Sequence, residues 1–306
     1  MNNGSGLNAR TLCMAAVFAA FAVGCGSGDD GQIFGEASGG GAGNPGPAGA
    51  GPSLGLAAPF GIAATAGVTN TPTAPLSHIN GNVILDPLAQ CNAVNVDGAG
   101  GFGLCAGSPP TINGTVVSSL FDPSANRAQI RADMNTAFLS ITPPAGPPAA
   151  GSRGGATNLP AGTTLGEPTG SALVQGDNLF VPGIYQSLTS ILITGDITLD
   201  AQGNSSAVFI FQSSSTIGLA NASRILLING AKASNVFWQA STSATLGIGS
   251  TWEGNILAAN SITMNTGATS CGRLFAGAWV GGGGAFVFDS NVVSVPGHAS
   301  APASCQ

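Results

Sequence analysis

Short apolar runs that alternate with polar residues make up most of the chain from residue 53 onward. The stretches FGIAATAGVTNT (60–71), HINGNVILDP (78–87) and TINGTVVSS (111–119) show this alternation, and Gly, Asn or Pro residues interrupt them. The same pattern returns near residue 181 and continues to residue 295. A period of two residues between turn formers predicts short β-strands. We therefore expect a mainly β domain.

One segment has a different period. Ile130, Met134, Phe138 and Ile141 follow one another at spacings of four, four and three residues, which places them on one stripe of an amphipathic helix. An Asp-Pro pair at residues 122–123 supplies an N-cap and a first turn, and a Pro-Pro pair follows the last apolar position. These signals predict a single long helix over residues 122–141. The Pro-, Gly- and Thr-rich residues 143–168 are expected to form a loop.

The chain contains a repeat near its C-terminus. SATLGIGSTWEGNILA (243–258) and SITMNTGATSCGRLFA (261–276) align without a gap when Ser243 is placed on Ser261. A pair formed by a Thr and a following apolar residue also occurs four times. The first two pairs and the last two pairs are separated by the same distance in sequence as the two repeat segments, and a longer interval lies between the second pair and the third. We assign the additional residues of the long interval to an inserted strand pair within residues 224–238. The four Thr-apolar pairs are Thr198-Leu199, Thr216-Ile217, Thr245-Leu246 and Thr263-Met264.

A period of about 18 residues fits one coil of a triangular β-solenoid with three short strands and Gly-rich corners. In each Thr-apolar pair, alternation along the strand turns the apolar side chain inward and the Thr outward. Because successive coils stack about 4.8 Å apart, the outward Thr residues are expected to form a straight column on a flat face.

Several of these stretches resemble one known family. GDITLDAQGNSSAVFIF (195–211), INGAKASNVFWQ (228–239), the two repeat segments and VPGIYQS (181–187) are similar to the ice-binding proteins that fold as a right-handed, discontinuous β-solenoid. The resemblance covers residues 54–295. It implies a triangular solenoid with one long helix packed alongside, N-terminal strands that pair with C-terminal ones, and a loop-rich cap.

The resemblance also implies a site, because ice binders of this family carry a T-A/G-x-T/N motif on a flat face. Thr266-Gly267-Ala268-Thr269 matches the motif in full, whereas the counterpart one coil earlier begins with Ile248. We therefore expect an ice-binding face that contains Thr without forming a regular Thr array. The alternative is that Thr is simply a favourable outward strand residue. The candidate ice-contacting residues are Thr245, Thr251, Thr263, Thr266, Thr269, Ser243 and Ser261.

The amino-acid composition limits the classes of partner that the protein can bind. Only 7% of the residues are charged, the net charge is -6, and Lys232 is the single lysine. Seven Lys and Arg residues cannot neutralise a nucleic acid backbone, so nucleic acid is not an expected partner. Between residues 189 and 295, Lys232 and Glu253 are the only Lys and Glu. An uncharged surface of this kind suits ice and ordered water as partner, and we expect a monomer without a cofactor.

The N-terminus has the pattern of an export signal. Arg10 precedes an apolar run at residues 12–23, which is too short to span a bilayer and is followed by Cys25 in a sequence similar to a bacterial lipobox. We expect a signal peptide at 1–24, lipidation of Cys25 and a surface lipoprotein, or secretion if cleavage follows Ala22 instead. The Gly-, Ala- and Pro-rich residues 25–52 are expected to be a tether, and residues 53–306 the solenoid domain.

Four cysteines remain in the mature domain, and three pairings are possible. Cys91 and Cys105 flank a Gly-rich stretch, so we expect them to pair with each other and Cys271 to pair with Cys305. A zinc site is the alternative, but the chain has no C-x-x-C pair and neither histidine lies within five residues of a cysteine.

Two other classes of function are possible for a solenoid. A solenoid hydrolase or lyase needs paired carboxylates or a base with a cation, and the candidates are Asp196 with Asp200 and Asp289 with Arg273. Both aspartates of the first pair lie beside turn residues, so we expect no enzyme. A cell-surface adhesin or structural display domain without ice activity is the second alternative, and it is consistent with a lipid tether.

Overall fold

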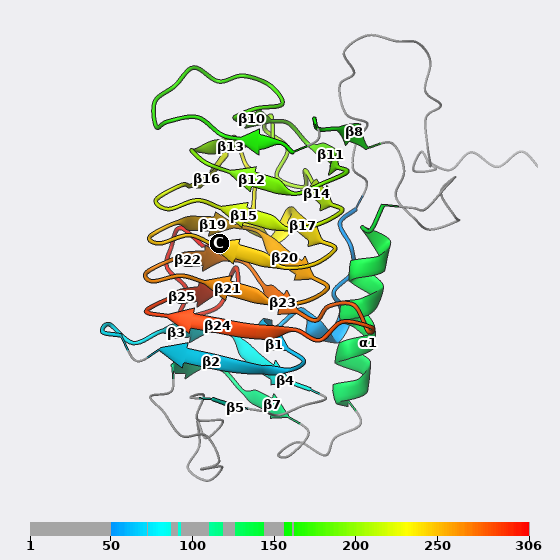
Figure 1. Ribbon diagram of the computed structural model, residues 1–306, viewed down its shortest axis with the longest axis vertical. Helices are drawn as coiled ribbons and strands as arrows, with labels where there is room; N and C mark the ends of the chain where they lie inside the picture. The colour runs from blue at the N-terminus through cyan, green and yellow to red at the C-terminus, as the bar shows by residue number, and fades with distance from the viewer. Residues whose placement is uncertain are drawn as a thin grey trace, which may run out of the picture. The chain divides into compact units, whose positions relative to one another are not determined.

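Three walls of parallel strands wind around one apolar interior, and a helix runs along one of them (Figure 1). The computed structural model describes residues 50–71, 73–86, 91–92, 110–118, 126–143, 156–160 and 162–305, with the backbone alone at residues 91–92. The proposed signal peptide, Cys25, most of the tether and Cys105 lie outside these residues. The expected pairing of Cys91 with Cys105 therefore stays a prediction.

The first wall is sheet A, a nine-stranded parallel sheet. Its strands are, in spatial order, β7 (Val116–Ser118), β4 (Asn82–Leu85), β1 (Phe60–Ala64), β23 (Leu274–Ala276), β20 (Asn255–Ala258), β17 (Val236–Ala240), β14 (Phe209–Ser213), β11 (Gly183–Ser187) and β8 (Thr157–Asn158).

The second wall is sheet B, an eight-stranded parallel sheet. Its strands are, in spatial order, β5 (Cys91–Asn92), β2 (Gly67–Thr71), β24 (Ala285–Asp289), β21 (Ile262–Met264), β18 (Ala244–Leu246), β15 (Ile217–Leu219), β12 (Ile191–Ile193) and β9 (Thr164–Leu165).

The third wall consists of two sheets joined by a bridge between Arg224 and Thr251. Sheet C holds, in order, β19 (Thr251–Glu253), β22 (Thr269–Cys271), β25 (Val292–Ser294), β3 (His78–Asn80) and β6 (Thr111–Asn113). A three-stranded sheet continues the wall with β10 (Leu179–Phe180), β13 (Ile197–Asp200) and β16 (Ile225–Ile228).

The sequence repeat corresponds to one full coil. Thr245 of β18 pairs with Thr263 of β21 on sheet B, and Ile256 of β20 pairs with Leu274 of β23 on sheet A. The repeated glycine has a steric reason, because a Cβ on Gly272 would lie 1.9 Å from the carbonyl oxygen of Gly254 in the coil beside it. The predicted solenoid and this part of its register are confirmed.

Other coils are longer, and one predicted equivalence is wrong. Thr198 lies on β13 of the third wall, where it pairs with Leu226, so it does not share a column with Thr216 at the edge of sheet B. The interval between these two threonines equals that of the repeat, but it is not a coil. The inserted residues 224–238 are also not a local strand pair, because β16 joins the third wall and β17 joins sheet A.

The solenoid is discontinuous, as the family resemblance implies. Strands β1, β2 and β3 each lie beside a strand from the C-terminal part of the chain, namely β23, β24 and β25. The coils that follow β1 to β3 in space, with β4 to β7, extend the same three walls. The N-terminal and C-terminal parts of the domain thus share one stack.

Helix α1 (Asn126–Ser140) is the one α-helix in the described residues, and two 3-10 turns, Gly55–Ala57 and Ala233–Asn235, accompany it. The apolar stripe Ile130, Met134, Phe138 and Ile141 is buried, as predicted. Gln212 of β14 donates a 2.8 Å hydrogen bond from Nε2 to the carbonyl oxygen of Ile141. The predicted helix start near residue 122 lies outside the described residues. No helix in the described part of the chain has the length and apolarity of a membrane span.

Aromatic side chains stack through the interior at the upper coils. The ring of Phe211 lies 4.0 Å from that of Trp238, and Trp238 lies 4.8 Å from Trp252, with both tryptophans fully buried. Both tryptophans thus belong to the central core. Trp279 is 43% exposed.

The predicted loop at residues 143–168 is only partly irregular. Strand β8 pairs with β11 on sheet A, and β9 pairs with β12 on sheet B. Each strand has two residues, too few for alternation to reveal it in the sequence. The strands at this end of the solenoid therefore begin before residue 181.

Candidate functional site

The helix covers sheet A. Outward side chains of this sheet, such as Ile210, Phe237 and Leu257, are buried in one cluster with Met134 and Phe138 of α1. This apolar contact fixes the helix along the stack (Figure 1). Sheet A therefore serves as the packing surface for α1.

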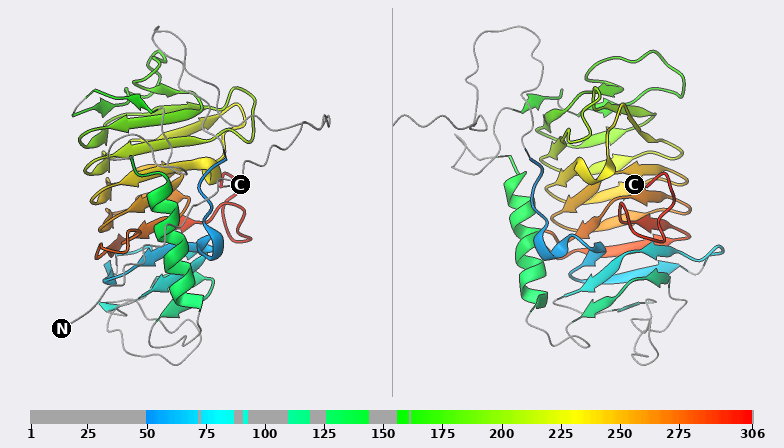
Figure 2. Two further views of the ribbon diagram at one scale, coloured as in Figure 1. Left: turned by 90° about the vertical axis from the view of Figure 1, so that its right-hand side faces the viewer. Right: turned by 180° about the vertical axis from the view of Figure 1, so that it is seen from behind.

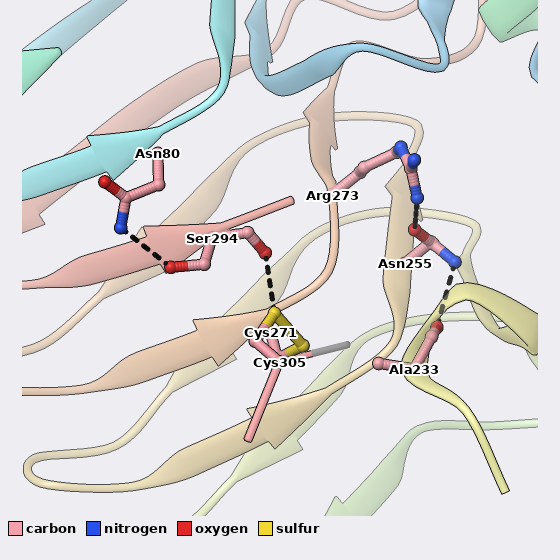
Figure 3. The surroundings of a disulfide bond; sticks show 7 residues. All are labelled: Asn80, Ala233, Asn255, Cys271, Arg273, Ser294 and Cys305. Atoms are coloured by element: carbon pink, nitrogen blue, oxygen red, sulfur yellow. Dashed lines mark hydrogen bonds between the residues drawn. A yellow bond between two sulfur atoms is a disulfide. The ribbon is translucent and has the colours of Figure 1, made fainter. Parts of the chain in front are cut away.

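The C-terminal tail lies over sheet C (Figure 2). A disulfide joins Cys271 of β22 to Cys305, which is the pairing expected from the sequence (Figure 3). Sγ of Cys305 lies 3.4 Å from the carbonyl oxygen of Ser294 on β25, and both cysteines pack against Ala233. The tail thus takes up part of this wall.

The third wall also carries ionisable side chains. Burial raises the pKa of Glu253 on β19 to about 8, and no hydrogen-bond partner reaches its Oε2 atom. Further along the wall, Arg224 donates to Asp196 at 2.6 Å, and this hydrogen bond lowers the pKa of Asp196. His78 of β3 is exposed. Ionisable side chains therefore interrupt the outward surface of this wall.

Sheet B has a central column of uncharged outward residues, which we call the middle column. Each member is a register partner of the next, and the apolar residues on either side of it along the strand point inward. The middle column reads, in spatial order, Thr164, Leu192, Gly218, Thr245, Thr263, Val287 and Thr69. It consists of four threonines, two aliphatic residues and one glycine.

A second column of hydroxyl groups runs beside the middle column, at the edge toward sheet A. It contains Ser190, Thr216, Ser243 and Ser261, each of which directly precedes a strand of sheet B. The hydroxyl of Thr216 donates to that of Ser190 at 2.9 Å, and Ser261 Oγ accepts the backbone N–H of Ala285 at 3.1 Å. These bonds hold the hydroxyl groups of Ser190, Thr216 and Ser261 in fixed positions along the edge.

Sheet B carries little charge. Along its described strands, Asp289 at the end of β24 is the one outward ionisable side chain. The hydroxyl of Thr266 donates to Oδ2 of Asp289, so this carboxylate is engaged at the corner toward sheet C. The centre of sheet B is therefore formed by hydroxyl, methyl and glycine groups.

The structure divides the seven candidate residues among three places. Ser243, Ser261, Thr245 and Thr263 lie together on sheet B, and we call these four the hydroxyl patch. The expectation of one shared face is wrong for the other three. Thr251 and Thr269 are register partners on sheet C, and Thr266 lies at the corner between the two walls.

Sequence reasoning missed several outward threonines of sheet B. Thr69 and Thr71 stand two residues apart on β2, and that alternation was a usable signal. Thr216 was recognised as a member of a Thr-apolar pair but was not selected as a candidate. Thr164 on β9 and exposed Thr194 beyond β12 lie in segments with too little alternation to find them.

The carboxylates considered for catalysis have structural contacts. Oδ1 of Asp200 accepts from the backbone of Gln202 at 2.7 Å and from Asn229 at 2.8 Å, which fixes a turn. Asp289 ends a strand of sheet B, whereas Arg273 directly precedes β23 of sheet A, so these two do not form a pair. Among the described residues, no group of three His, Cys, Asp or Glu side chains could hold a metal ion.

Comparison with known proteins gives consistent results. The family model described as Ice-binding-like matches residues 62–281. An ice-binding protein of Nostoc sp. (strain HG1) is 35% identical over 242 residues, which cover 79% of this chain and 73% of that protein. An ice-binding protein of Flammulina populicola is 28% identical over 246 residues, which cover 80% of this chain and 88% of that protein.

Solved structures show the same similarity. The crystal structure of an ice-binding protein from the Antarctic ascomycete Antarctomyces psychrotrophicus matches with a TM-score of 0.57 at 32% sequence identity. The match covers 80% of this chain and 98% of that one. The similarity therefore extends over most of the described solenoid.

Proposed function

Because the chain belongs to the ice-binding-like family, we propose that it binds ice, and that it does so through the hydroxyl patch and the middle column of sheet B. Antifreeze action, such as the shaping of ice crystals or the inhibition of recrystallisation, is the expected result. The choice of sheet B rests on one observation. Among the described residues, it presents the longest row of uncharged outward side chains, whereas α1 covers sheet A and the disulfide-bonded tail takes up part of sheet C.

The chemistry of the surface supports this choice. An ice surface offers neither a charge nor a pocket, so a protein can hold it only by ordering water against a rigid plane. Hydroxyl groups bond that water and the methyl groups of Thr lie between them. Neighbouring strands hold Thr245 and Thr263 about 4.8 Å apart, and a side chain fixed by its neighbours loses little freedom on binding.

The repeat supplies a matched pair of variants for the test. Thr263 and Thr269 are both partly exposed, six residues apart in one coil, but they lie on different walls. Thr263→Tyr places a ring in the middle of sheet B and should abolish ice shaping. Thr269→Tyr adds the same ring to sheet C and should leave ice shaping unchanged. Both variants should keep their stability within about 1 kcal/mol, as expected for surface positions.

The measurement is ice-crystal morphology and thermal hysteresis of the two folded variants beside the parent chain. Loss of activity in Thr269→Tyr alone would move the site to sheet C. Retention of activity in both variants would exclude the hydroxyl patch and sheet C together. A parent chain that neither shapes ice nor shows hysteresis would contradict ice binding itself.

We further propose that the protein is exported and held at the cell surface. The apolar run at residues 12–23 and Cys25 support this proposal, and so does the disulfide between Cys271 and Cys305, since such bonds persist in oxidising compartments. Secretion after cleavage at Ala22 is the alternative. Metabolic labelling with a radioactive fatty acid distinguishes the two, because the parent chain incorporates the label and Cys25→Ala does not.

A further inference from the structure

The first described residues of the chain follow the edge of the solenoid where sheet C passes into sheet A. Pro52 and Leu54 are buried, and Gly51 packs against the ring of Phe237, the second residue of β17. Leu56 donates its backbone N–H to Asp133 Oδ2 of α1 at 2.7 Å. Residues 51–58 are therefore fixed to the domain.

Arg273 joins this segment to the coils. Its Nε atom donates to the carbonyl oxygen of Ala58 at 2.5 Å, and its Nη1 atom donates to Asn255 Oδ1 at 3.0 Å. Arg273 lies between β22 of sheet C and β23 of sheet A, and Asn255 begins β20 of sheet A. Arg273 and Asn255 therefore both lie at the edge between sheets C and A. Figure 2 shows the N-terminal segment (blue) beside the helix along this edge.

This edge is the one opposite sheet B. In each coil the chain passes from sheet B to sheet C, then to sheet A, and then back to sheet B, as in the series β18, β19, β20, β21. In a solenoid with three walls, the edge between sheets C and A faces away from sheet B. The chain therefore enters the domain on the side remote from the hydroxyl patch.

We infer that a protein held through its N-terminal segment presents sheet B outward, so that it can attach its support to an ice surface. The inference rests on the proposed ice binding. It adds that ice and the support lie on opposite sides of the domain. A chain that entered on sheet B would bring its support against the face that must contact ice. Here both can be engaged at once.

The single lysine permits a direct test. Lys232 is exposed and immediately precedes the 3-10 turn Ala233–Asn235. This turn lies between β16 of the third wall and β17 of sheet A, which is the same edge. Coupling through amines therefore uses only Lys232 and the N-terminus. Both attachments leave sheet B directed away from the support.

The experiment couples the chain from Gly26 onward to polymer beads through its amines with a short linker and measures capture of the beads by a slowly growing ice front. Beads that carry the parent chain should be captured. Beads that carry Thr263→Tyr should fall to the level of bare beads, and beads that carry Thr269→Tyr should behave as the parent. Lys232→Arg, coupled through the N-terminus alone, should retain capture.

The outcomes separate this inference from the proposed function. If the free parent chain shapes ice but its amine-coupled beads are not captured, the display arrangement is wrong. If beads with Thr263→Tyr are captured as well as the parent, the surface that meets ice is not sheet B. If the free parent chain does not shape ice at all, ice binding is wrong and bead capture should be absent.

Discussion

Glu253 illustrates how one residue can couple the stability of this domain to pH. Its carboxyl group lies on β19 next to Cys271, and burial raises its pKa to about 8. A glutamate in the unfolded chain ionises near a pH of about 4.3. Between these two values the folded chain holds a proton that the unfolded chain has released, so the free energy of unfolding falls as the pH rises.

We predict that Glu253→Gln removes this dependence. The stabilising effect of the protonated side chain in the parent is complete below about pH 4.3 and is lost as the pH rises toward 8. A pKa unit corresponds to about 1.4 kcal/mol, so after allowance for solvent the variant should be more stable than the parent at pH 9 by on the order of 2–5 kcal/mol. Thermal unfolding at pH 4, 6.5 and 9 measures the difference.

The two unfolding curves should converge at low pH, where both side chains are uncharged. Parallel curves for the parent and Glu253→Gln across the whole range would show that folding does not raise the pKa of Glu253. Ice shaping should be the same in both proteins, because Glu253 belongs to sheet C and the proposed ice-binding surface to sheet B.

For single residues, the sequence predicts whether a side chain points inward or outward better than it predicts the wall on which the residue lies. Leu246 and Met264 are buried while Thr245 and Thr263 face outward, because alternation along a strand is a local property. Which wall a residue belongs to depends on where the corners fall. That is why Thr269, only six residues after Thr263, was wrongly expected on the same face.

For strands and coils, too, the sequence predicts only part of the arrangement. The repeat is visible in the sequence because the coil from β18 to β21 contains no insertion, whereas the coils from β12 to β15 and from β15 to β18 are longer. Insertions at the corners change the length of a coil without changing the stacking of its strands. The helix, in contrast, was predicted well because its apolar stripe is set by residues within one segment.

One pair of neighbouring strands interrupts the hydroxyl groups of the middle column. Leu192 of β12 is 43% exposed, and a Cβ on Gly218 of β15 would lie 3.0 Å from its Cδ1 atom. The leucine therefore leans over the glycine and fills the space where a larger side chain would stand. These two residues separate Thr164 from Thr245 in the column.

We predict that Leu192→Thr combined with Gly218→Thr raises thermal hysteresis above that of the parent, because five threonines then follow one another. Gly218→Thr alone should be less stable than the double variant by about 0.5–1.5 kcal/mol, because its side chain must displace the exposed end of Leu192 from its rotamer. Leu192→Thr alone should change stability by about 0.5 kcal/mol or less. A double-mutant cycle on thermal unfolding, with hysteresis measured for all four proteins, tests the coupling.

If Gly218→Thr is as stable alone as in the double variant, the two side chains do not interact as described. If the folded double variant has no more hysteresis than the parent, the upper part of the middle column does not contact ice, and the site is confined to the hydroxyl patch.

In the whole molecule, distant parts of the chain complete one another. Strand β1 lies between β23 and β4, so Ile62 pairs with Leu274 on one side and with Val83 on the other. No local pattern predicts the pairing with Leu274, and the sequence indicated it only through the resemblance to a family. The disulfide could be predicted because few pairings were possible, but the wall that its tail covers could not.

Removal of the disulfide between Cys271 and Cys305 should lower the stability of the domain without changing its ice binding. It closes a loop with a sequence separation of 34 residues, for which the chain-entropy relation gives about 3–4 kcal/mol. Cys271→Ala combined with Cys305→Ala should therefore lower the melting temperature by roughly 6–16 °C. The tail lies on sheet C, so near the freezing point, where the variant is folded, thermal hysteresis should equal that of the parent. Circular dichroism at the temperature of the ice assay serves as the control for folding. A folded variant without ice activity would show that the tail, or the wall it covers, takes part in binding ice.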